Sequence, residues 1–186
     1  MKNIAIFASG SGTNYEAIME KVEDGFIKAN VVLMASDHAD AYVCTRAKNH
    51  NTPVFIINYK GRKKEEYEAE LVAKLKELHV DLIVLAGYMR LCGSVLLDAY
   101  EGRIINIHPA LLPSFKGAHG IKDAFDYGVK VFGVTVHYVD SGMDSGKIID
   151  QRAFHYTEGE TVDMVEARIH EIEHVLYPEV IKKLTD

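Results

Sequence analysis

Short apolar runs alternate with amphipathic stretches along the chain as far as Ile107. Each run is followed by polar or glycine residues, a pattern typical of a strand that is buried on both faces. In the stretches between the runs, apolar residues recur three or four positions apart, as on one face of a helix. We therefore predict strands at 3–8, 31–36, 54–57, 82–86 and 104–107, with helical faces formed by Tyr15, Ile18, Met19 and Val22 and by Tyr67, Leu71, Leu75 and Leu78.

The pattern changes beyond Ile107. Residues 109–120 carry proline and glycine and are expected to form a loop, with a short helix after it. Two further strands are predicted at 133–139 and 147–154, joined by a turn at 140–146. The last helix is predicted from Thr161 onward, with Pro178 breaking or bending it. Its apolar face is formed by Val162, Val165, Ile169, Ile172 and Leu176.

The succession of strand, helix and strand predicts an α/β fold. We expect a doubly wound, mostly parallel sheet flanked by helices, with right-handed crossovers, as in Rossmann-like folds. A chain of 186 residues fits one domain, so residues 1–186 are expected to form a single unit. Ligands of such sheets bind beyond the carboxyl ends of the strands, and the chemistry is expected there.

Composition and charge narrow the classes of function. The net charge is −6 and no Lys/Arg-rich run is present, which disfavours binding to duplex nucleic acid. No segment has the character of a membrane span or of a secretory signal, so we expect a cytoplasmic protein without a membrane partner. The two cysteines, Cys44 and Cys92, lie far apart in sequence, which predicts neither a disulfide framework nor a cysteine-rich metal site.

The first predicted strand leads into the glycine-rich segment 9–14, Ser-Gly-Ser-Gly-Thr-Asn, just before a helix. Glycines let the backbone approach an anion, and the N–H groups at the start of a helix donate to it, with Ser11 or Thr13 as the expected cap. The segment is not a Walker A loop, because Lys and Ser/Thr are missing at the required places. Tyr15 stands at the third glycine position of a dinucleotide fingerprint. Dinucleotide binding, with Asp37 as the ribose-binding acid, therefore stays open only as an alternative, as does a plain turn without a ligand.

Two polar residues end the strand predicted at 104–107. Asn106 and His108 are two positions apart, so their side chains point to the same side, where they form a pair of donors suited to the oxyanion of an acyl transfer. Asp144 follows in the 140–146 turn. If this turn folds back over His108, the carboxylate favours the charged, proton-donating form of the imidazole. Asp140 is interpreted as a turn residue.

A further motif points to different chemistry. Residues 170–174, His-Glu-Ile-Glu-His, match the H-E-x-x-H pattern of zinc peptidases, with two histidines one helical turn apart. No third ligand follows them, and a pattern this short arises by chance. We expect no metal, and we keep a zinc hydrolase built on His170 and His174 as an alternative.

Five segments together resemble the phosphoribosylglycinamide formyltransferase family, and the similarity covers nearly the whole chain. Asn-Ile-His-Pro-Ala-Leu-Leu-Pro at 106–113, with the later His137 and Asp144-Ser145-Gly146, is characteristic of folate-dependent formyltransferases as a group. The glycine-rich segment narrows the resemblance to the glycinamide ribonucleotide enzymes. The matching segments are 8–14, 85–90, 105–113, 133–139 with 144–146, and 173–178.

The resemblance implies transfer of a formyl group from 10-formyltetrahydrofolate to the amine of 5'-phosphoribosylglycinamide in de novo purine synthesis, by direct attack through a tetrahedral intermediate and without a metal. It implies a monomer or homodimer whose partners are these two small molecules. The implied catalytic residues are Asn106, His108 and Asp144. The implied residues for the phosphoribosyl substrate are Gly12, Thr13, Asn14, His170 and Glu173. The implied folate-binding residues are Lys64, Met89, Arg90, Leu91, Cys92, Asn106, Val139, Asp140, Ser141, Gly142, Met143 and Asp144.

The chain departs from the family pattern at a few points. Cys92 stands where an aliphatic residue is frequent, Lys116 stands where proline is usual, and the sequence ends at Asp186 without the C-terminal strand of longer members. Methionyl-tRNA formyltransferase is disfavoured because a tRNA-binding domain and a basic patch are lacking. Formyltetrahydrofolate hydrolase is disfavoured because its extra N-terminal domain is lacking. A nucleotide-binding module without catalysis stays open as an alternative.

Overall fold

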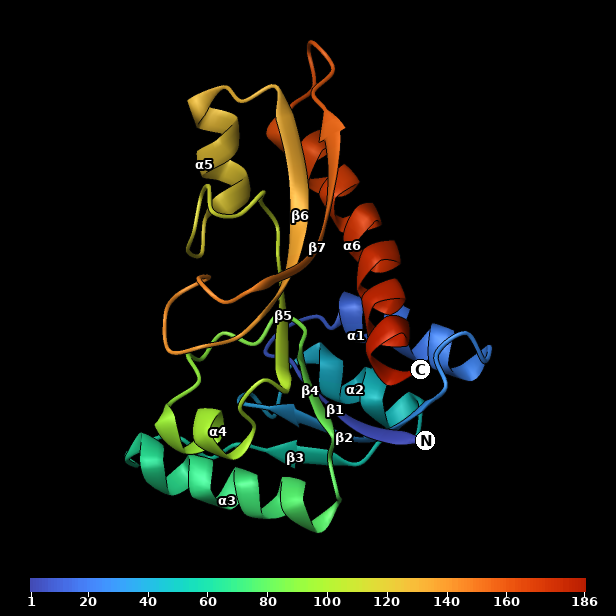
Figure 1. Ribbon diagram of the computed structural model, residues 1–186, viewed down its shortest axis with the longest axis vertical. Helices are drawn as coiled ribbons and strands as arrows, with labels where there is room; N and C mark the ends of the chain where they lie inside the picture. Colours follow the sequence, from blue (N-terminus) through green and yellow to red (C-terminus); the bar gives the residue numbers. More distant parts are fainter.

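A seven-stranded sheet forms the centre of the protein, whose computed structural model describes residues 1–186 (Figure 1). The strands lie in the order β3-β2-β1-β4-β5-β6-β7. The first five strands in this order are parallel to one another, while β6 and β7 extend the sheet as antiparallel strands. The prediction of a doubly wound, mostly parallel sheet is confirmed. The strands are β1 (Lys2–Phe7), β2 (Ala29–Ser36), β3 (Val54–Ile56), β4 (Leu82–Leu85), β5 (Ile104–His108), β6 (Val131–Tyr138) and β7 (Ile148–His155).

Helices cover both faces of the sheet (Figure 1). The helices are α1 (Thr13–Glu23), α2 (Tyr42–Asn49), α3 (Lys64–Glu77), α4 (Ser94–Ala99), α5 (Gly120–Tyr127) and α6 (Val162–Thr185). Side chains alternate along β1, so that Ile4 and Ile6 pack with α1, α2 and α6, whereas Ala5 and Phe7 pack with α3 and α4. The first core contains 26 buried residues and the second 14, and the central strands are therefore buried on both faces as predicted.

The strand predicted at 54–57 is not buried on both faces. β3 lies at the edge of the sheet, and Val54 and Ile56 are each 40% exposed, so the prediction of burial on both faces is wrong for this strand. An edge strand has a neighbour on one side only, and an apolar run does not reveal its place in the sheet order. The short helices α2 and α4 were not predicted. Few of their residues are buried, so their apolar periodicity is weak.

The last helix was predicted to break or bend at Pro178, and it does not break there, because α6 continues past Pro178 to Thr185. Proline removes one backbone donor, but its ring is buried here among the apolar residues that hold α6 on the sheet. The helix begins as predicted at Thr161, whose hydroxyl accepts a hydrogen bond from the N–H of Met164 at 3.2 Å. None of the helices combines the length and the apolar character needed to cross a membrane.

Candidate active site

Four polar side chains gather on one face of the sheet where β5 meets β6. The two strands are antiparallel, with Asn106 opposite His137 and His108 opposite Thr135. Residues directly opposite each other in such a pair project to the same face, which is here the face covered further along by α3 and α4. His108, Thr135 and His137 are buried and Asn106 is half-buried. The arrangement gives Asn106 and His108 the common orientation that their spacing predicts.

Asp144 reaches this polar group from the loop between β6 and β7. Its Oδ2 atom lies 3.6 Å from Nδ1 of His108, and its Oδ1 atom lies 3.8 Å from Nε2 of His137. The carboxylate also accepts a hydrogen bond from the N–H of Gly117 at 2.8 Å. The 140–146 loop therefore folds back over β5, an approach that sequence spacing alone left open. Asp140 has the geometry of a turn residue, because its Oδ1 accepts from the N–H of Gly142 and from the hydroxyl of Ser145.

The imidazole of His108 lies between two acceptors. Its Nε2 atom is 2.8 Å from the carbonyl oxygen of Phe115, and Asp144 faces its Nδ1 atom. A carbonyl can only accept, so Nε2 carries a proton in this contact. A carboxylate at the opposite nitrogen is also an acceptor. Asp144 thus faces the second nitrogen at 3.6 Å, a separation longer than a hydrogen bond.

His137 differs from His108 in its electrostatics. Burial lowers the pKa of His137, and the hydrogen bond to the Tyr138 carbonyl and the charge of Asp144 offset this effect only in part. The Nδ1 atom donates to that carbonyl at 2.8 Å, while the buried Nε2 atom has no hydrogen-bond partner. The lowered pKa favours the neutral form of His137, which does not form an ion pair with Asp144. In the sequence this residue stands out only as part of a motif; its position opposite Asn106 could be found only from the register of β5 and β6.

The loop after β5 is fastened to the sheet by Thr135. The Thr135 hydroxyl donates to the carbonyl of Ala110 at 2.8 Å and accepts from the N–H of Leu112 at 3.1 Å. Nε2 of Gln151 donates to the same hydroxyl at 3.0 Å and to the Leu112 carbonyl at 2.9 Å. These bonds hold the base of the segment whose Phe115 carbonyl reaches His108.

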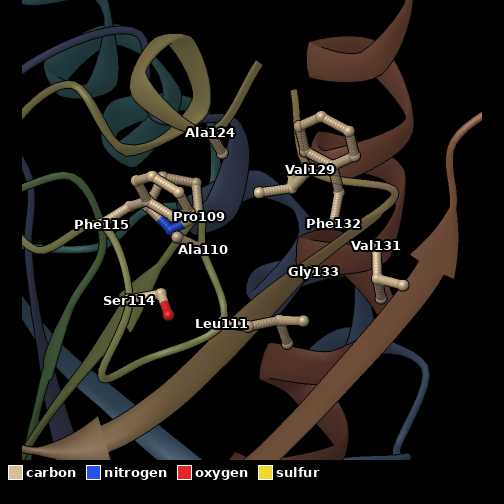
Figure 2. A pocket seen from close by; sticks show the side chains of 10 residues that line it. All are labelled: Pro109, Ala110, Leu111, Ser114, Phe115, Ala124, Val129, Val131, Phe132 and Gly133. Atoms are coloured by element: carbon tan, nitrogen blue, oxygen red, sulfur yellow. The ribbon is translucent and has the colours of Figure 1, made fainter. Parts of the chain in front are cut away.

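A mostly apolar hollow lies behind this loop, between α5 and β6, with a volume of about 110 Å³. Figure 2 shows the Phe115 ring at one side of the hollow, Phe132 of β6 at the other and Ala124 of α5 between them. The loop is therefore fastened at its base but loosely packed under its middle.

The glycine-rich segment between β1 and α1 places backbone N–H groups at a helix start. Gly12 is the N-cap of α1, with φ at 78°, and a Cβ atom there would lie 2.4 Å from Cγ2 of Val43. No side chain caps the helix, so the prediction of Ser11 or Thr13 as the cap is wrong. The left-handed conformation of Gly12 takes the place of a side-chain cap, which leaves the first N–H groups of α1 available to an anion. Nε of Arg46 steadies the segment by donating to the Ser11 carbonyl at 2.7 Å.

The two histidines of the H-E-x-x-H match lie on α6, which packs against α1. Nδ1 of His170 is 2.6 Å from Oε1 of Glu173, a hydrogen bond that raises the pKa of His170. His174 lines a polar hollow together with Thr13 at the start of α1. No group of three or more His, Cys, Asp or Glu residues has an arrangement that could hold a metal ion. The ring nitrogens of His170 thus face Glu173 and Glu166 on α6. This arrangement does not support the zinc hydrolase alternative.

The segment after β4 is exposed and apolar on its outer side. Met89 and Leu91 are 75% and 62% exposed, while Arg90 and Cys92 turn inward. Burial raises the pKa of the Cys92 thiol to about 12, so it stays a neutral, packed side chain. The N–H of Met89 donates to the Ser9 hydroxyl at 2.9 Å, and Nζ of Lys64 donates to the Leu91 carbonyl at 2.8 Å.

Asp37 does not suit the dinucleotide alternative. Its side chain is 1% exposed and faces Arg90 and His38, so it is not presented to a ribose in solvent.

Comparisons with known proteins point to one family. The model of a family described as formyl transferase matches residues 2–181. A phosphoribosylglycinamide formyltransferase of Bacillus subtilis (strain 168) is 47% identical over 185 residues, which cover 99% of this chain and 95% of that protein. The crystal structure of glycinamide ribonucleotide transformylase 1 from Geobacillus kaustophilus superposes with a TM-score of 0.97 at 48% identity, and the match covers 100% of both chains. The trifunctional purine biosynthetic protein adenosine-3 of Drosophila melanogaster is 38% identical over 188 residues, which are 14% of its length.

Proposed function

The chain belongs to the formyl transferase family, and from this premise we propose that it transfers the formyl group of 10-formyltetrahydrofolate to the amine of 5'-phosphoribosylglycinamide in purine biosynthesis. The chain is thus a transferase. The observation that carries the catalytic part of the proposal is the convergence of Asp144 on His108 beside Asn106.

The reaction begins when the substrate amine attacks the carbon of the N10-formyl group. The electron pair of the C=O double bond moves to oxygen, and a tetrahedral oxyanion forms. The Asn106 amide and Nε2 of His108 donate to this oxygen, and one such donor typically contributes a factor of about 10² to 10³ to the rate. The intermediate collapses as the bond from carbon to N10 breaks. Asp144, which faces Nδ1 of His108, relays the proton lost by the amine to N10 through water.

The Phe115 carbonyl accepts the hydrogen bond of Nε2 of His108 in this structure. In the proposed reaction the oxyanion takes over this hydrogen bond, so the loop carbonyl has to move aside. The hollow beside Phe115 gives the loop room for that movement. Binding of the substrates is thereby linked to release of the catalytic imidazole.

Each substrate has a proposed place. The phosphoribosyl group binds at Gly12, Thr13 and Asn14, where free N–H groups and the positive end of α1 suit a phosphate. The charged form of His170, favoured by its hydrogen bond to Glu173, adds to this attraction. The folate lies against the outer side of residues 89–92, with the 140–144 loop over the pterin and Lys64 towards its glutamate tail. We propose the cytoplasm as the setting and a monomer or homodimer as the active form.

A direct test measures formyl transfer to phosphoribosylglycinamide by the purified protein, with tetrahydrofolate and the formylated amine both quantified. We expect equal amounts of the two products. The Asn106→Ala and His108→Ala variants should fold normally, bind folate and lose about two orders of magnitude or more in turnover. Formation of tetrahydrofolate without the formylated amine would indicate a hydrolase instead. A near-parental rate in either variant would contradict the oxyanion assignment.

A further inference from the structure

Arg90 lies in the middle of the exposed segment 89–92, yet its side chain turns into the protein. The guanidinium carbon lies 3.2 Å from the centroid of the Tyr59 ring, and Nε lies 3.3 Å from Oδ2 of Asp37. Both neighbours attract a guanidinium, one through the face of an aromatic ring and the other through its charge. The outer side of the segment is left to the apolar side chains of Met89 and Leu91.

Asp37 is an unusual partner because it is buried. Its side chain is 1% exposed, its Oδ1 atom has no hydrogen-bond partner, and Nε of Arg90 has none either. A carboxylate in such a place is unfavourable unless a cation lies beside it. His38 is 3.6 Å away but half-exposed and charged only when protonated, whereas Arg90 is charged at every physiological pH. The buried Asp37 carboxylate therefore depends on Arg90, whose side chain is 30% exposed and whose guanidinium reaches in to it.

The order of strands in the sheet shows which segments the Asp37–Arg90 ion pair connects. Asp37 follows β2 and Arg90 follows β4, and β1 lies between these strands in the sheet. The Arg90 side chain thus crosses the end of β1 to reach Asp37. The other contacts of the segment, from Ser9 and Lys64, hold backbone atoms of Met89 and Leu91. The contacts to Asp37 and Tyr59 act on the side chain of Arg90, the residue between them.

We propose that Asp37 is a positioning residue for the folate. Through Arg90, and with Tyr59, it holds residues 89–92 so that Met89 and Leu91 present an apolar surface to the pterin. Asp37 itself does not touch the ligand. This inference rests on the proposed function, because it assigns the outer side of 89–92 to the formyl donor.

The test compares the parent with Asp37→Asn, Arg90→Met and the double variant. Calorimetry measures the affinity for tetrahydrofolate, the product of the proposed reaction, and separately the affinity for phosphoribosylglycinamide. We expect each single variant to bind tetrahydrofolate about tenfold or more weakly and phosphoribosylglycinamide about as tightly as the parent. KM for the formyl donor should rise in step, while kcat at a saturating concentration stays near the parental value. The double variant should be no weaker than the singles, because both substitutions break one pair.

The matched control is Glu179→Gln, which removes a carboxylate from the half-exposed Arg152–Glu179 ion pair and should change neither affinity. Parental affinity for tetrahydrofolate in Asp37→Asn would overturn the inference. Equal losses for both ligands together with a lower melting temperature would show general damage and would also overturn it. Recovery in the double variant would assign the defect to an unpaired Arg90 charge instead of a lost anchor. The proposed function fails separately, if the parent binds tetrahydrofolate but transfers no formyl group.

Discussion

Replacing Thr135 by valine tests how the loop over the catalytic group is held. Valine has the shape of threonine, so the substitution removes the hydroxyl and little else. Two buried loop groups lose their partner, namely the Ala110 carbonyl and the Leu112 N–H. Gln151 keeps its other bond, to the Leu112 carbonyl. A buried polar group left unpaired costs about 1–3 kcal/mol, so two of them predict a loss of about 2–6 kcal/mol in the free energy of unfolding.

The assays are urea unfolding and hydrogen exchange of the Leu112 amide. For a chain of this length, the smallest expected loss lowers the melting temperature by about 4 °C or more. If the loop detaches locally, the global loss is smaller but exchange at Leu112 accelerates, and formyl transfer falls because Phe115 and Gly117 lose their support. Thr135→Ser keeps the hydroxyl and should retain most of the stability and activity. Thr45→Val, at an exposed threonine on α2, is the control for the substitution itself. Stability within about 0.5 kcal/mol of the parent, with unchanged exchange at Leu112, would refute the reasoning.

Three further predictions follow from the site and its surroundings. Gly12→Ala should weaken phosphoribosylglycinamide binding about tenfold or more, because the positive φ disfavours a side chain and the new Cβ atom would collide with Val43. The control is Gly10→Ala, where a Cβ meets nothing within 4 Å, and its effect should be milder. Equal KM values for both variants would contradict this expectation. Treatment with a chelator should leave formyl transfer unchanged and metal analysis should find no stoichiometric zinc; zinc-restored activity would instead require a metal mechanism. His50→Gln should destabilise the protein more at pH 6 than at pH 9. Burial alone would lower the pKa of His50, but the hydrogen bonds and charges of Glu16 and Glu23 outweigh burial, and the pKa is raised. The stabilisation by His50 is therefore complete below the unfolded pKa of about 6.5 and is lost as the pH rises through the folded pKa. Equal losses of stability at both pH values in chemical denaturation would disprove this.

Much of the fold could be predicted because the central strands are buried on both faces. Continuous apolar runs such as Leu82–Leu85, bounded by polar or glycine residues, are typical of such strands. The same pattern misled at Val54 and Ile56, since the sequence does not show which strand lies at an edge. At Pro178 the expected break does not occur, because burial of the ring and the packing of α6 outweigh one missing hydrogen bond. Local pattern predicts elements well but not the tertiary contacts that override it.

The candidate site also contains features that local geometry predicts and features that depend on tertiary contacts. Asn106 and His108 could be paired from their spacing, because strand geometry fixes which way their side chains point. The approach of Asp144 depends on how a seven-residue turn folds, and no local rule gives that. His137 stands in a family motif, but its position opposite Asn106 follows only from the register between β5 and β6. The expected side-chain cap of α1 does not form because the N-cap is Gly12, a position where a Cβ atom would lie 2.4 Å from Cγ2 of Val43.

The hydrogen bond from the Met89 N–H to the Ser9 hydroxyl joins the two segments proposed to hold the two substrates. Ser9 leads into the glycine-rich segment, and Met89 begins the segment assigned to the folate. A shift that one ligand imposes on Ser9 or Met89 would act on this hydrogen bond and so on the other segment. Thermodynamic linkage then requires reciprocity: the factor by which the nucleotide alters the affinity for folate equals the factor by which folate alters the affinity for the nucleotide. Together with the backbone hydrogen bond from the Ser9 N–H to the Gly87 carbonyl at 3.1 Å, the Ser9 hydroxyl is the contact through which such cooperativity between the co-substrates would act.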